Sequence, residues 1–451
     1  MIAPARVAAF HILSAVAAGR TNLPAAIARV RASLPDERDR ALAAEIATGV
    51  QRWRAAIDYL IAHFSARRIE RLDADILEIL RLSMYQLLHL TRVPSSAIVD
   101  DAVELAKWSG KGHAGGFVNA VLRTLSRNRD QLPLPPRPRT SSERQAAVKY
   151  LGTTLSHPDW LAERWYDRLG LDAAEQWMTF NNAPAALTLR ANRLMITPKE
   201  LLARLAAHGV IASAGRFAPD ALIIETGQPL QHPALEGLFV VQDEASQLVT
   251  LLAGADPGRW ILDTCASPGG KATALAATVR HGSHVVACDL RERRIALLRR
   301  TVRATRALNV LLLQADLMRS LPLARVFDCV IVDAPCSGLG TLRRDPDIRW
   351  RRREVDLVAL ADAERRMLRH AADAVVPGGR LIYATCSSEP EENEEVVAAF
   401  LDESRDFRIV DARGVHPALP PAVIDEQGHL RTSPSQHRLE AFFGAVFEHI
   451  T

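Results

Sequence analysis

The chain has 451 residues, 48% of them hydrophobic and 24% charged, which is typical of a globular protein with two or three domains. No stretch approaches the ~20 consecutive apolar residues of a membrane span. None of the five cysteines falls in a C-x-x-C pair, so the sequence indicates neither a zinc site nor a disulfide framework. We therefore expect a cytoplasmic protein that binds no membrane and no metal.

The net charge of +4 is unevenly distributed along the chain. Residues 1–140 carry a net charge of +7, and residues 141–451 carry a net charge of −3. A basic N-terminal third suits a polyanionic partner such as RNA, although an ordinary solvated surface would produce the same count.

The N-terminal part, residues 1–132, shows a succession of amphipathic helical patterns with short polar breaks and no strand pattern. We predict an all-α bundle here. The predicted helices span residues 5–18, 23–34, 36–64, 74–89, 95–108 and 116–127. Four prolines then follow between residues 132 and 138, and they predict a domain linker at 133–140 that lets the flanking parts fold separately.

Residues 141–240 mix the two patterns, with strands predicted at 187–190 and 222–225 and a helix at 198–208 between them. We interpret this region as a small α+β module that binds RNA. Residues 241–451 alternate strand and helix, which predicts an α/β domain of class I, Rossmann-like type with a parallel sheet covered on both faces. Its predicted strands are 261–264, 284–289, 310–316, 327–333 and 380–385, and its predicted helices are 271–279, 291–307, 354–376 and 391–401.

A glycine-rich loop follows the first of these strands and precedes a helix. Glycines at such a turn let backbone N–H groups approach a ligand closely. An ordinary Pro-Gly-Gly turn is the alternative. A P-loop would need Gly in place of Cys265 and Ser or Thr in place of Ala272, and the dinucleotide pattern G-x-G-x-x-G is absent, so S-adenosylmethionine (SAM) is favoured over ATP or NAD. The candidate cofactor residues of the loop are Cys265, Ala266, Ser267, Pro268, Gly269, Gly270 and Lys271.

Two aspartates end the next two predicted strands. Asp289 stands 19 residues after Gly270, close to the offset of about 20 expected for a carboxylate that binds ribose hydroxyls. Asp316 is placed to accept a hydrogen bond from an adenine amine. Each aspartate could instead cap a following helix.

Two cysteine motifs also stand at predicted strand ends. Asp333-Ala-Pro-Cys336 ends the fourth strand and Thr385-Cys386 ends the fifth, so both thiols face one pocket if these strands are neighbours. We interpret the other two downstream cysteines, Cys288 and Cys329, as core residues. Either Cys336 or Cys386 could be a nucleophile on this reasoning.

Together, these motifs resemble those of RNA cytosine-C5 methyltransferases that use SAM. Over nearly its full length the chain is similar to the bacterial 16S rRNA (cytosine-C5) methyltransferase B family, whose N-terminal domain is NusB-like. The most characteristic further stretches are residues 117–123, 338–350 and 389–393.

The resemblance implies methylation of carbon 5 of a cytosine in 16S rRNA through a covalent Cys–C6 adduct. Cys386 would be the nucleophile, Cys336 would assist release, and Asp333 would serve both catalysis and SAM binding. The loop Cys265–Lys271 with Asp289 and Asp316 would complete the SAM site. Ser267 and Ala272 depart from the family's usual Ala and Thr, and residues 439–443 replace its usual Asp-Gly-Phe-Phe.

The expected partner is 16S rRNA, free or partly assembled into the small subunit, bound by a monomer. The alternatives are a transfer RNA or another rRNA site as substrate, or a non-catalytic RNA-binding scaffold. Within the arginine-rich run 343–353, Trp350 combines a stacking surface with basic neighbours and so suits an unpaired base, although inward packing is the alternative.

Overall fold

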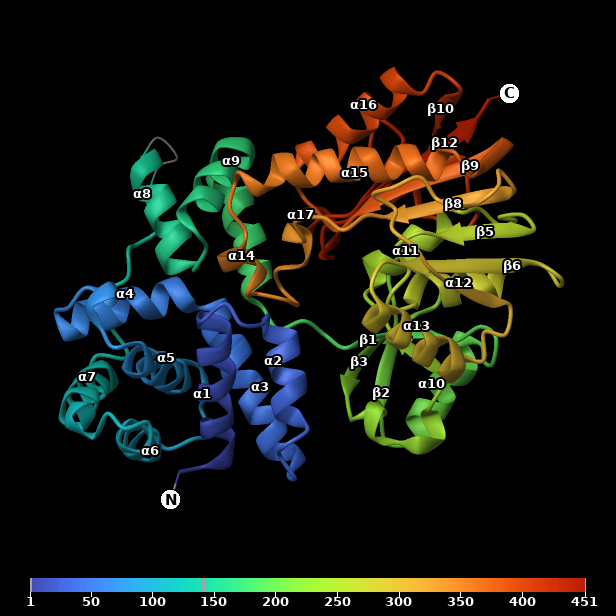
Figure 1. The fold of residues 1–451 in the computed structure, drawn as a ribbon. Coiled ribbons are helices and arrows are strands. Elements are labelled where there is room, and N and C mark those ends of the chain that lie inside the picture. The colour runs from blue at the N-terminus through green and yellow to red at the C-terminus, as the bar shows by residue number, and fades with distance from the viewer. Residues whose placement is uncertain (1, 140–142, 451) are drawn as a thin grey trace. The chain divides into compact units, whose positions relative to one another are not determined.

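The computed structural model describes residues 2–139 and 143–450, and the chain forms two compact units (Figure 1). Unit 1 comprises Met1–Pro184 and Leu342–Glu354, and unit 2 comprises Ala185–Thr341 and Val355–Thr451. The end of the predicted linker at residue 140 and the start of the predicted module at 141–142 lie outside the described residues. In the part of the chain that the structure describes, no helix is both long and apolar enough to cross a membrane.

Unit 1 is helical, which confirms the predicted bundle. Its core is built from the apolar faces of the first seven α-helices. The predicted helix 36–64 is two helices, because Trp53 leaves the helical region (φ −109°, ψ 18°). The helices are α1 (Pro4–Ala17), α2 (Leu23–Arg31), α3 (Glu37–Arg52), α4 (Arg54–Ser65), α5 (Ala74–His89), α6 (Ser95–Trp108), α7 (Gly115–Arg127), α8 (Arg144–Lys149), α9 (Asp159–Asn182) and α14 (Ile348–Arg351).

The proline-rich segment is docked on this unit. Leu132 and Leu134 pack against the bundle core. The Thr154 hydroxyl donates to the Pro135 carbonyl at 2.7 Å, and Arg137 forms ion pairs with acidic residues of α9. The compact unit therefore continues past residues 133–140 to Pro184, and the helices α8 and α9 group with the bundle rather than with the α+β module.

The arginine-rich run 342–354 also belongs to unit 1, and its aromatic residue points inward. The indole Nε1–H of Trp350 donates to the Gln51 carbonyl at 2.6 Å, and Asp347 accepts from the Leu23 N–H at 3.0 Å. Arg349 is fully buried and donates to the Ser156 carbonyl at 2.9 Å. The prediction that Trp350 offers a stacking surface for a base is therefore wrong, because the indole is used to anchor this segment.

Arg349 allows a test of this anchor. Its guanidinium also donates to Asn182 Oδ1 at 2.9 Å, and burial lowers its pKa to about 9. Arg349→Ala leaves buried carbonyls without donors and should lower the free energy of unfolding of unit 1 by about 2–4 kcal/mol in urea titrations. The exposed Arg92→Ala should change it by less than about 0.5 kcal/mol. Equal stabilities of the two variants would contradict the anchoring role.

Unit 2 contains a small antiparallel sheet with strand order β2-β3-β1-β4, next to the helix α10. This confirms the predicted α+β character, although β2 and β4 were not predicted. A capping box between Thr197 and Glu200 begins α10. The elements are β1 (Thr188–Ala191), α10 (Pro198–Ala207), β2 (Ile211–Ala214), β3 (Ala221–Thr226) and β4 (Phe239–Val241).

The large sheet of unit 2 has the order β10-β12-β9-β8-β5-β6-β7, with β11 paired to β12. The five predicted strands are confirmed and run parallel. The prediction of an entirely parallel sheet is wrong at one edge, because β12 returns antiparallel between β9 and β10. The strands are β5 (Trp260–Asp263), β6 (His284–Asp289), β7 (Val310–Gln314), β8 (Phe327–Asp333), β9 (Val375–Thr385), β10 (Phe407–Val410), β11 (Leu430–Arg431) and β12 (Phe443–His449).

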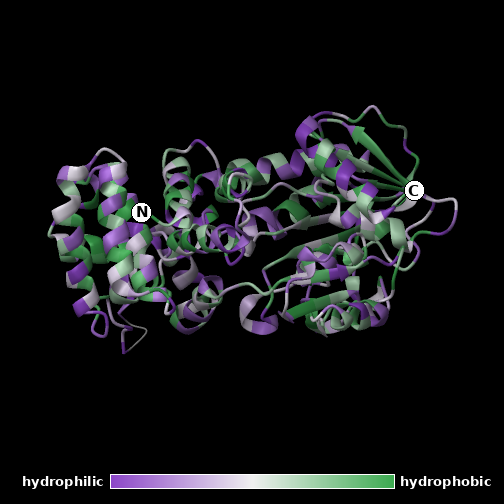
Figure 2. Ribbon diagram, turned by 90° about the horizontal axis from the view of Figure 1, so that it is seen from below, coloured by the Kyte–Doolittle hydropathy of each residue, from purple (hydrophilic) through white to green (hydrophobic). Residues whose placement is uncertain are grey.

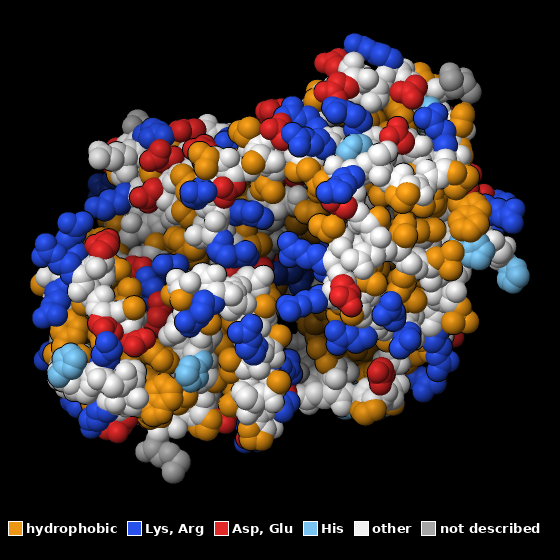
Figure 3. All heavy atoms as spheres, viewed as in Figure 1, with side chains coloured by type: hydrophobic (Ala, Val, Ile, Leu, Met, Phe, Trp, Pro, Cys, Tyr) orange, Lys and Arg blue, Asp and Glu red, His pale blue; other side chains and the backbone are white. Residues whose placement is uncertain are grey.

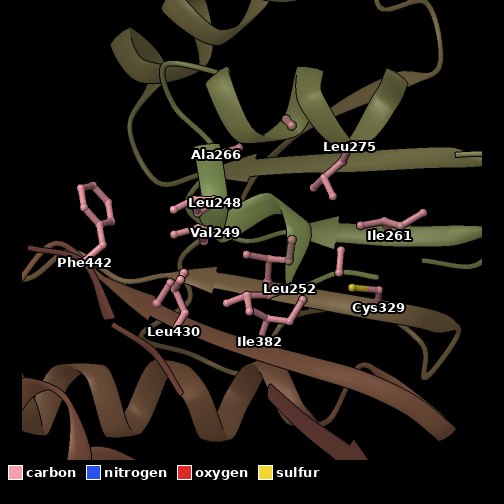
Figure 4. Close-up of a cluster of buried hydrophobic side chains, with 14 of the residues drawn as sticks. Leu248, Val249, Leu252, Ile261, Ala266, Leu275, Cys329, Ile382, Leu430 and Phe442 are labelled. Carbon is pink, nitrogen blue, oxygen red and sulfur yellow. The ribbon is translucent and has the colours of Figure 1, made fainter. Parts of the chain in front are cut away.

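Alternating strand residues enter two cores, one on each face of the sheet. Ile261 and Ile382 face the core under α11, α12 and α13, which Figure 4 shows in close-up. Their neighbours Leu262 and Leu381 face the other core, under α15 and α16. Figure 2 shows the hydrophobic character of these strands. The helices are α11 (Glu244–Leu251), α12 (Gly270–Thr278), α13 (Glu292–Thr305), α15 (Asp356–Ala372), α16 (Glu394–Glu403) and α17 (Pro434–His437).

Candidate active site

The glycine-rich loop joins the carboxyl end of β5 to the start of α12, as predicted. Gly269 has φ +111°, and a Cβ there would lie 2.8 Å from a methyl carbon of Leu298, so only glycine fits. A cavity of about 400 Å³ opens over the loop. It is lined by Val240, Val241, Gln242, Asp243, Ser246, Asp263, Cys265, Ala266, Ser267, Pro268, Gly270, Lys271, Thr301, Asp333 and Phe442.

Asp263 was not predicted as a site residue, although its place at the end of β5 was visible in the sequence. Its carboxylate is fully buried at the cavity, and neither oxygen has a hydrogen-bond partner of good geometry among the described residues. Burial, reinforced by the neighbouring Asp333 carboxylate, raises the pKa of Asp263 to about 7. A buried acid in this state needs a hydrogen-bond donor or a cation from a ligand.

The two predicted ribose and adenine carboxylates lie outside the lining set of this cavity. Asp289 ends β6 and braces the loop: its Oδ2 accepts from the Ser267 N–H at 3.2 Å and from Arg294 Nε at 2.9 Å. Asp316 follows β7 and accepts from the Met318 N–H at 3.0 Å.

Lys271 crosses the cavity to the end of β8, where its Nζ lies 2.6 Å from Asp333 Oδ2. Burial disfavours the charged form of this lysine. The carboxylates of Asp333 and Asp263, together with the Cys386 sulfur, outweigh that penalty and raise the pKa of Lys271. The lysine therefore remains an ammonium beside the second cysteine motif.

The two cysteine motifs meet, because β8 and β9 are parallel neighbours in the sheet. The Sγ atoms of Cys336 and Cys386 lie 3.3 Å apart. Cys288 and Cys329 are buried core residues, as predicted. Burial raises the pKa of the Cys265 thiol, so this cysteine of the cofactor loop is unsuited to nucleophilic attack.

A layer of buried acids lies behind the paired thiols and was missed by sequence reasoning. Glu392 belongs to the 3₁₀ turn Pro390–Glu392 and Glu364 belongs to α15. The Tyr383 hydroxyl lies 3.0 Å from Glu364 Oε2 and 2.5 Å from the Glu392 carbonyl oxygen. Burial is the largest cause that raises the pKa of Glu364 to about 9, and repulsion from the Glu392 carboxylate is the second largest. The stretch 389–393 had been noted only as part of a resemblance.

Sequence comparison matches three parts of the chain to known families. Residues 249–448 match the family described as 16S rRNA methyltransferase RsmB/F, and residues 3–127 match the NusB family. Residues 157–231 match the ferredoxin-like domain of RsmF/B-like methyltransferases. The fold and the site thus define an SAM-dependent methyltransferase with a NusB-like helical domain and a ferredoxin-like module.

Individual relatives extend over most of the chain. The Pseudomonas putida protein named ribosomal RNA small subunit methyltransferase B is 34% identical, over 90% of this chain and 91% of its own. The Bacillus subtilis protein named probable ribosomal RNA small subunit methyltransferase B is 31% identical, over 90% of each chain. The crystal structure of PH0851 shares the fold, with a TM-score of 0.81 over 99% of both chains at 24% identity. The chain belongs to the RsmB/F family of 16S rRNA methyltransferases.

The cavity residues fit SAM, the cofactor of this family. The unpartnered Asp263 carboxylate suits the cationic amino-acid part of SAM. The close-approach loop around Gly269 suits its nucleoside part. A Cβ on Gly270 would lie only 3.3 Å from the Gln242 side chain, so glycine keeps this wall open.

Asp289 yields a prediction for cofactor affinity. Asp289→Ala removes the acceptor that holds the Ser267 N–H of the cofactor loop. Charge-assisted hydrogen bonds of this kind are worth about 1.5–3 kcal/mol, so loss of this support for the loop should lower SAM affinity by about tenfold. Calorimetry would measure this, with Asp316→Ala in parallel and the exposed Asp402→Ala as the control. SAM binding by Asp289→Ala at wild-type affinity would remove this residue from the site.

Glu364 yields a prediction for pH dependence. In the unfolded chain a glutamate has lost its proton by about pH 5, whereas folded Glu364 keeps its proton up to about pH 9. The native state binds more protons between these values, so stability falls as the pH rises, by up to ~1.4 kcal/mol per pH unit. Glu364→Gln should flatten this decline in urea unfolding followed from about pH 5 to 9. Parallel curves for the two proteins would contradict the pKa shift.

Proposed function

We propose that this enzyme methylates carbon 5 of a cytosine in 16S rRNA through a covalent Cys386–C6 adduct. The observation that carries the proposal is the pair of thiols 3.3 Å apart at the carboxyl ends of β8 and β9, beside the SAM-sized cavity. Carbon 5 of cytosine is a poor nucleophile. Addition of a thiolate to carbon 6 makes carbon 5 enamine-like, and a second basic group is then needed to remove the carbon-5 proton.

The charges around the two thiols support different roles for them. The Lys271 ammonium lies close enough to Cys386 to interact with it electrostatically. Cys336 is hydrogen-bonded to Cys386, buried, and near the Glu392 and Glu364 carboxylates, which together raise its pKa well above the usual range. Once Cys336 has lost its own proton, this raised pKa makes its thiolate a strong base, which suits it to removing the carbon-5 proton. The position of Cys336 directly after Pro335 did not by itself indicate which of the two cysteines is the nucleophile.

The reaction then balances as follows. The Cys386 thiolate forms a bond to carbon 6, and N3 of the base takes a proton from the Lys271–Asp333 pair, in which the Lys271 ammonium supplies the proton and Asp333 passes it on. SAM, when bound, supplies the methyl group for carbon 5 and leaves as S-adenosylhomocysteine. Cys336, after giving its own proton to solvent, removes the carbon-5 proton as a thiolate. N3 gives back its proton, the Cys386–C6 bond breaks, and the Cys386 thiolate is released. The base must be unstacked from the RNA to reach these groups.

Substrate and product are tested directly. The protein is incubated with methyl-labelled SAM and undermethylated small-subunit RNA, either free or in partly assembled particles, and the modified nucleotide is mapped. We expect 5-methylcytosine at one position of 16S rRNA. Labelling of transfer RNA or large-subunit RNA instead would refute the assignment to 16S rRNA, and no labelling of any RNA would favour the scaffold alternative.

The cysteine roles make a second prediction. Cys386→Ala should abolish methyl transfer and leave SAM affinity near wild type, because its thiolate attacks the base and not the cofactor. Cys336→Ala should accumulate a denaturation-resistant protein–RNA adduct, because addition and methylation proceed while elimination stalls. Denaturing gels with labelled RNA would show this adduct as a band of protein-bound RNA. An adduct with Cys386→Ala and none with Cys336→Ala would reverse the assignment.

The basic surfaces of the two units offer a test of RNA binding. The net charge of +7 on residues 1–140 favours the helical bundle as an RNA-binding surface. Helix α13 adds exposed arginines, over which Figure 3 shows gathered Lys and Arg side chains. These are Arg291, Arg293, Arg294, Arg299, Arg300, Arg303 and Arg306. Within the described chain, Arg294 is the member of this set that forms an ion pair, with Asp289. We propose that the bundle and α13 both bind RNA phosphates.

Matched triple variants would separate the two surfaces. One changes Arg299, Arg300 and Arg303 to Gln, and the other changes the exposed bundle arginines Arg20, Arg29 and Arg92 to Gln. Each lost phosphate contact should flatten the slope of log affinity against log salt by about 0.7–0.9. We expect a flatter slope for both variants on one RNA. A wild-type slope for the bundle variant would assign the NusB-like domain a role other than phosphate binding.

A further inference from the structure

The stretch 389–393 donates no group to the reaction as proposed, yet it lies against both cysteine motifs. The Glu392 carboxylate is fully buried. Its Oε1 accepts from the Ser337 N–H at 2.5 Å, and its Oε2 accepts from the Ser337 hydroxyl at 2.6 Å and from the Ser387 hydroxyl. Each serine directly follows a cysteine of the pair in the sequence. One carboxylate therefore binds the residue next to each thiol.

Strand pairing stops short of the thiols, and one backbone hydrogen bond, from the Gly340 N–H to the Cys386 carbonyl at 3.0 Å, joins the two loops beyond it. The register of β8 and β9 ends at Asp333 opposite Ala384. Cys336 lies three residues beyond that point, in a loop. On the other loop, the Asn393 side chain donates to the Ser387 carbonyl at 3.1 Å and accepts from the Thr385 hydroxyl at 2.5 Å. Through these hydrogen bonds, Glu392 and Asn393 hold both loops in place.

We propose that Glu392 is a positioning residue that holds Cys336 within reach of the carbon-5 proton while Cys386 is bonded to the base. This inference rests on the proposed function. The Ser337 and Ser387 hydroxyls lie 3.2 Å apart and share one carboxylate oxygen, so loss of that acceptor removes the side-chain bridge next to the thiols. The backbone hydrogen bond from Gly340 to Cys386 remains. Cys386 directly follows β9. In the Cys336 loop, by contrast, loss of the carboxylate also leaves the Ser337 backbone N–H without its acceptor. The thiol displaced most is therefore the one that acts in release.

The test measures adduct accumulation with Cys336 still in place. Glu392→Ala removes the acceptor of three hydrogen bonds and should slow release about tenfold or more, since loss of even one charge-assisted hydrogen bond accounts for about tenfold. A methylated, denaturation-resistant adduct should then build up, while SAM affinity and the KM for RNA stay near wild type. Glu392→Gln keeps an acceptor for the Ser337 N–H and should restore part of the release rate. Ser337→Ala should act in the same direction as Glu392→Ala.

A merely structural role would lower the folded fraction without changing the ratio of adduct to released product. The exposed Glu395→Gln on α16 is the matched control and should behave as wild type. In the Cys336→Ala background, Glu392→Ala should add no further adduct, because both changes act on one step. A loss of product in proportion to folded protein, without adduct, would overturn the role of Glu392. Absence of adduct in Cys336→Ala itself would instead refute the proposed function.

Discussion

The parallel pairing of β8 with β9 brings two loops that are 50 residues apart in the sequence to one edge of the sheet. Hydrogen bonds along these strands fix the start of each loop, and β5 on the other side of β8 delivers the cofactor loop to the same edge. The cavity, the Lys271–Asp333 ion pair and the paired thiols all follow from this arrangement. A change of register by one residue would turn the strand residues that lead into these loops, such as Asp333, to the opposite face.

Behind this edge, buried polar groups replace the apolar packing found elsewhere in the sheet. Tyr383 points into the same core as Leu381 but ends among carboxylates. Such groups are costly to bury and specify a geometry only when each finds a partner. Here the hydroxyls of Ser337 and Ser387 and the backbone N–H of Ser337 satisfy one glutamate. A low local dielectric also strengthens the influence of that layer on the nearby thiols.

The sequence predicted the features that depend on local pattern and on the rule that parallel strands share one edge. The helices 74–89 and 95–108 and the strand-end motifs follow from periodicity and turn residues. Short strands such as β2 and β4 carry too few residues to show alternation. Glu392 touches Ser337 across 55 residues, which no local pattern encodes. Trp350 was misjudged because an arginine-rich run suggested solvent, whereas tertiary packing buries Arg349 and half-buries the indole.

The segment Leu342–Glu354 completes the helical unit although it follows β8 in the chain. During synthesis, residues 1–184 leave the ribosome long before this segment does. Until it arrives, the carbonyls of Gln51 and Ser156 lack the donors that Trp350 and Arg349 supply in the finished protein. Contacts so distant in sequence form late and slowly. The N-terminal domain of the nascent chain therefore cannot form these hydrogen bonds until about half of the catalytic sheet has been translated.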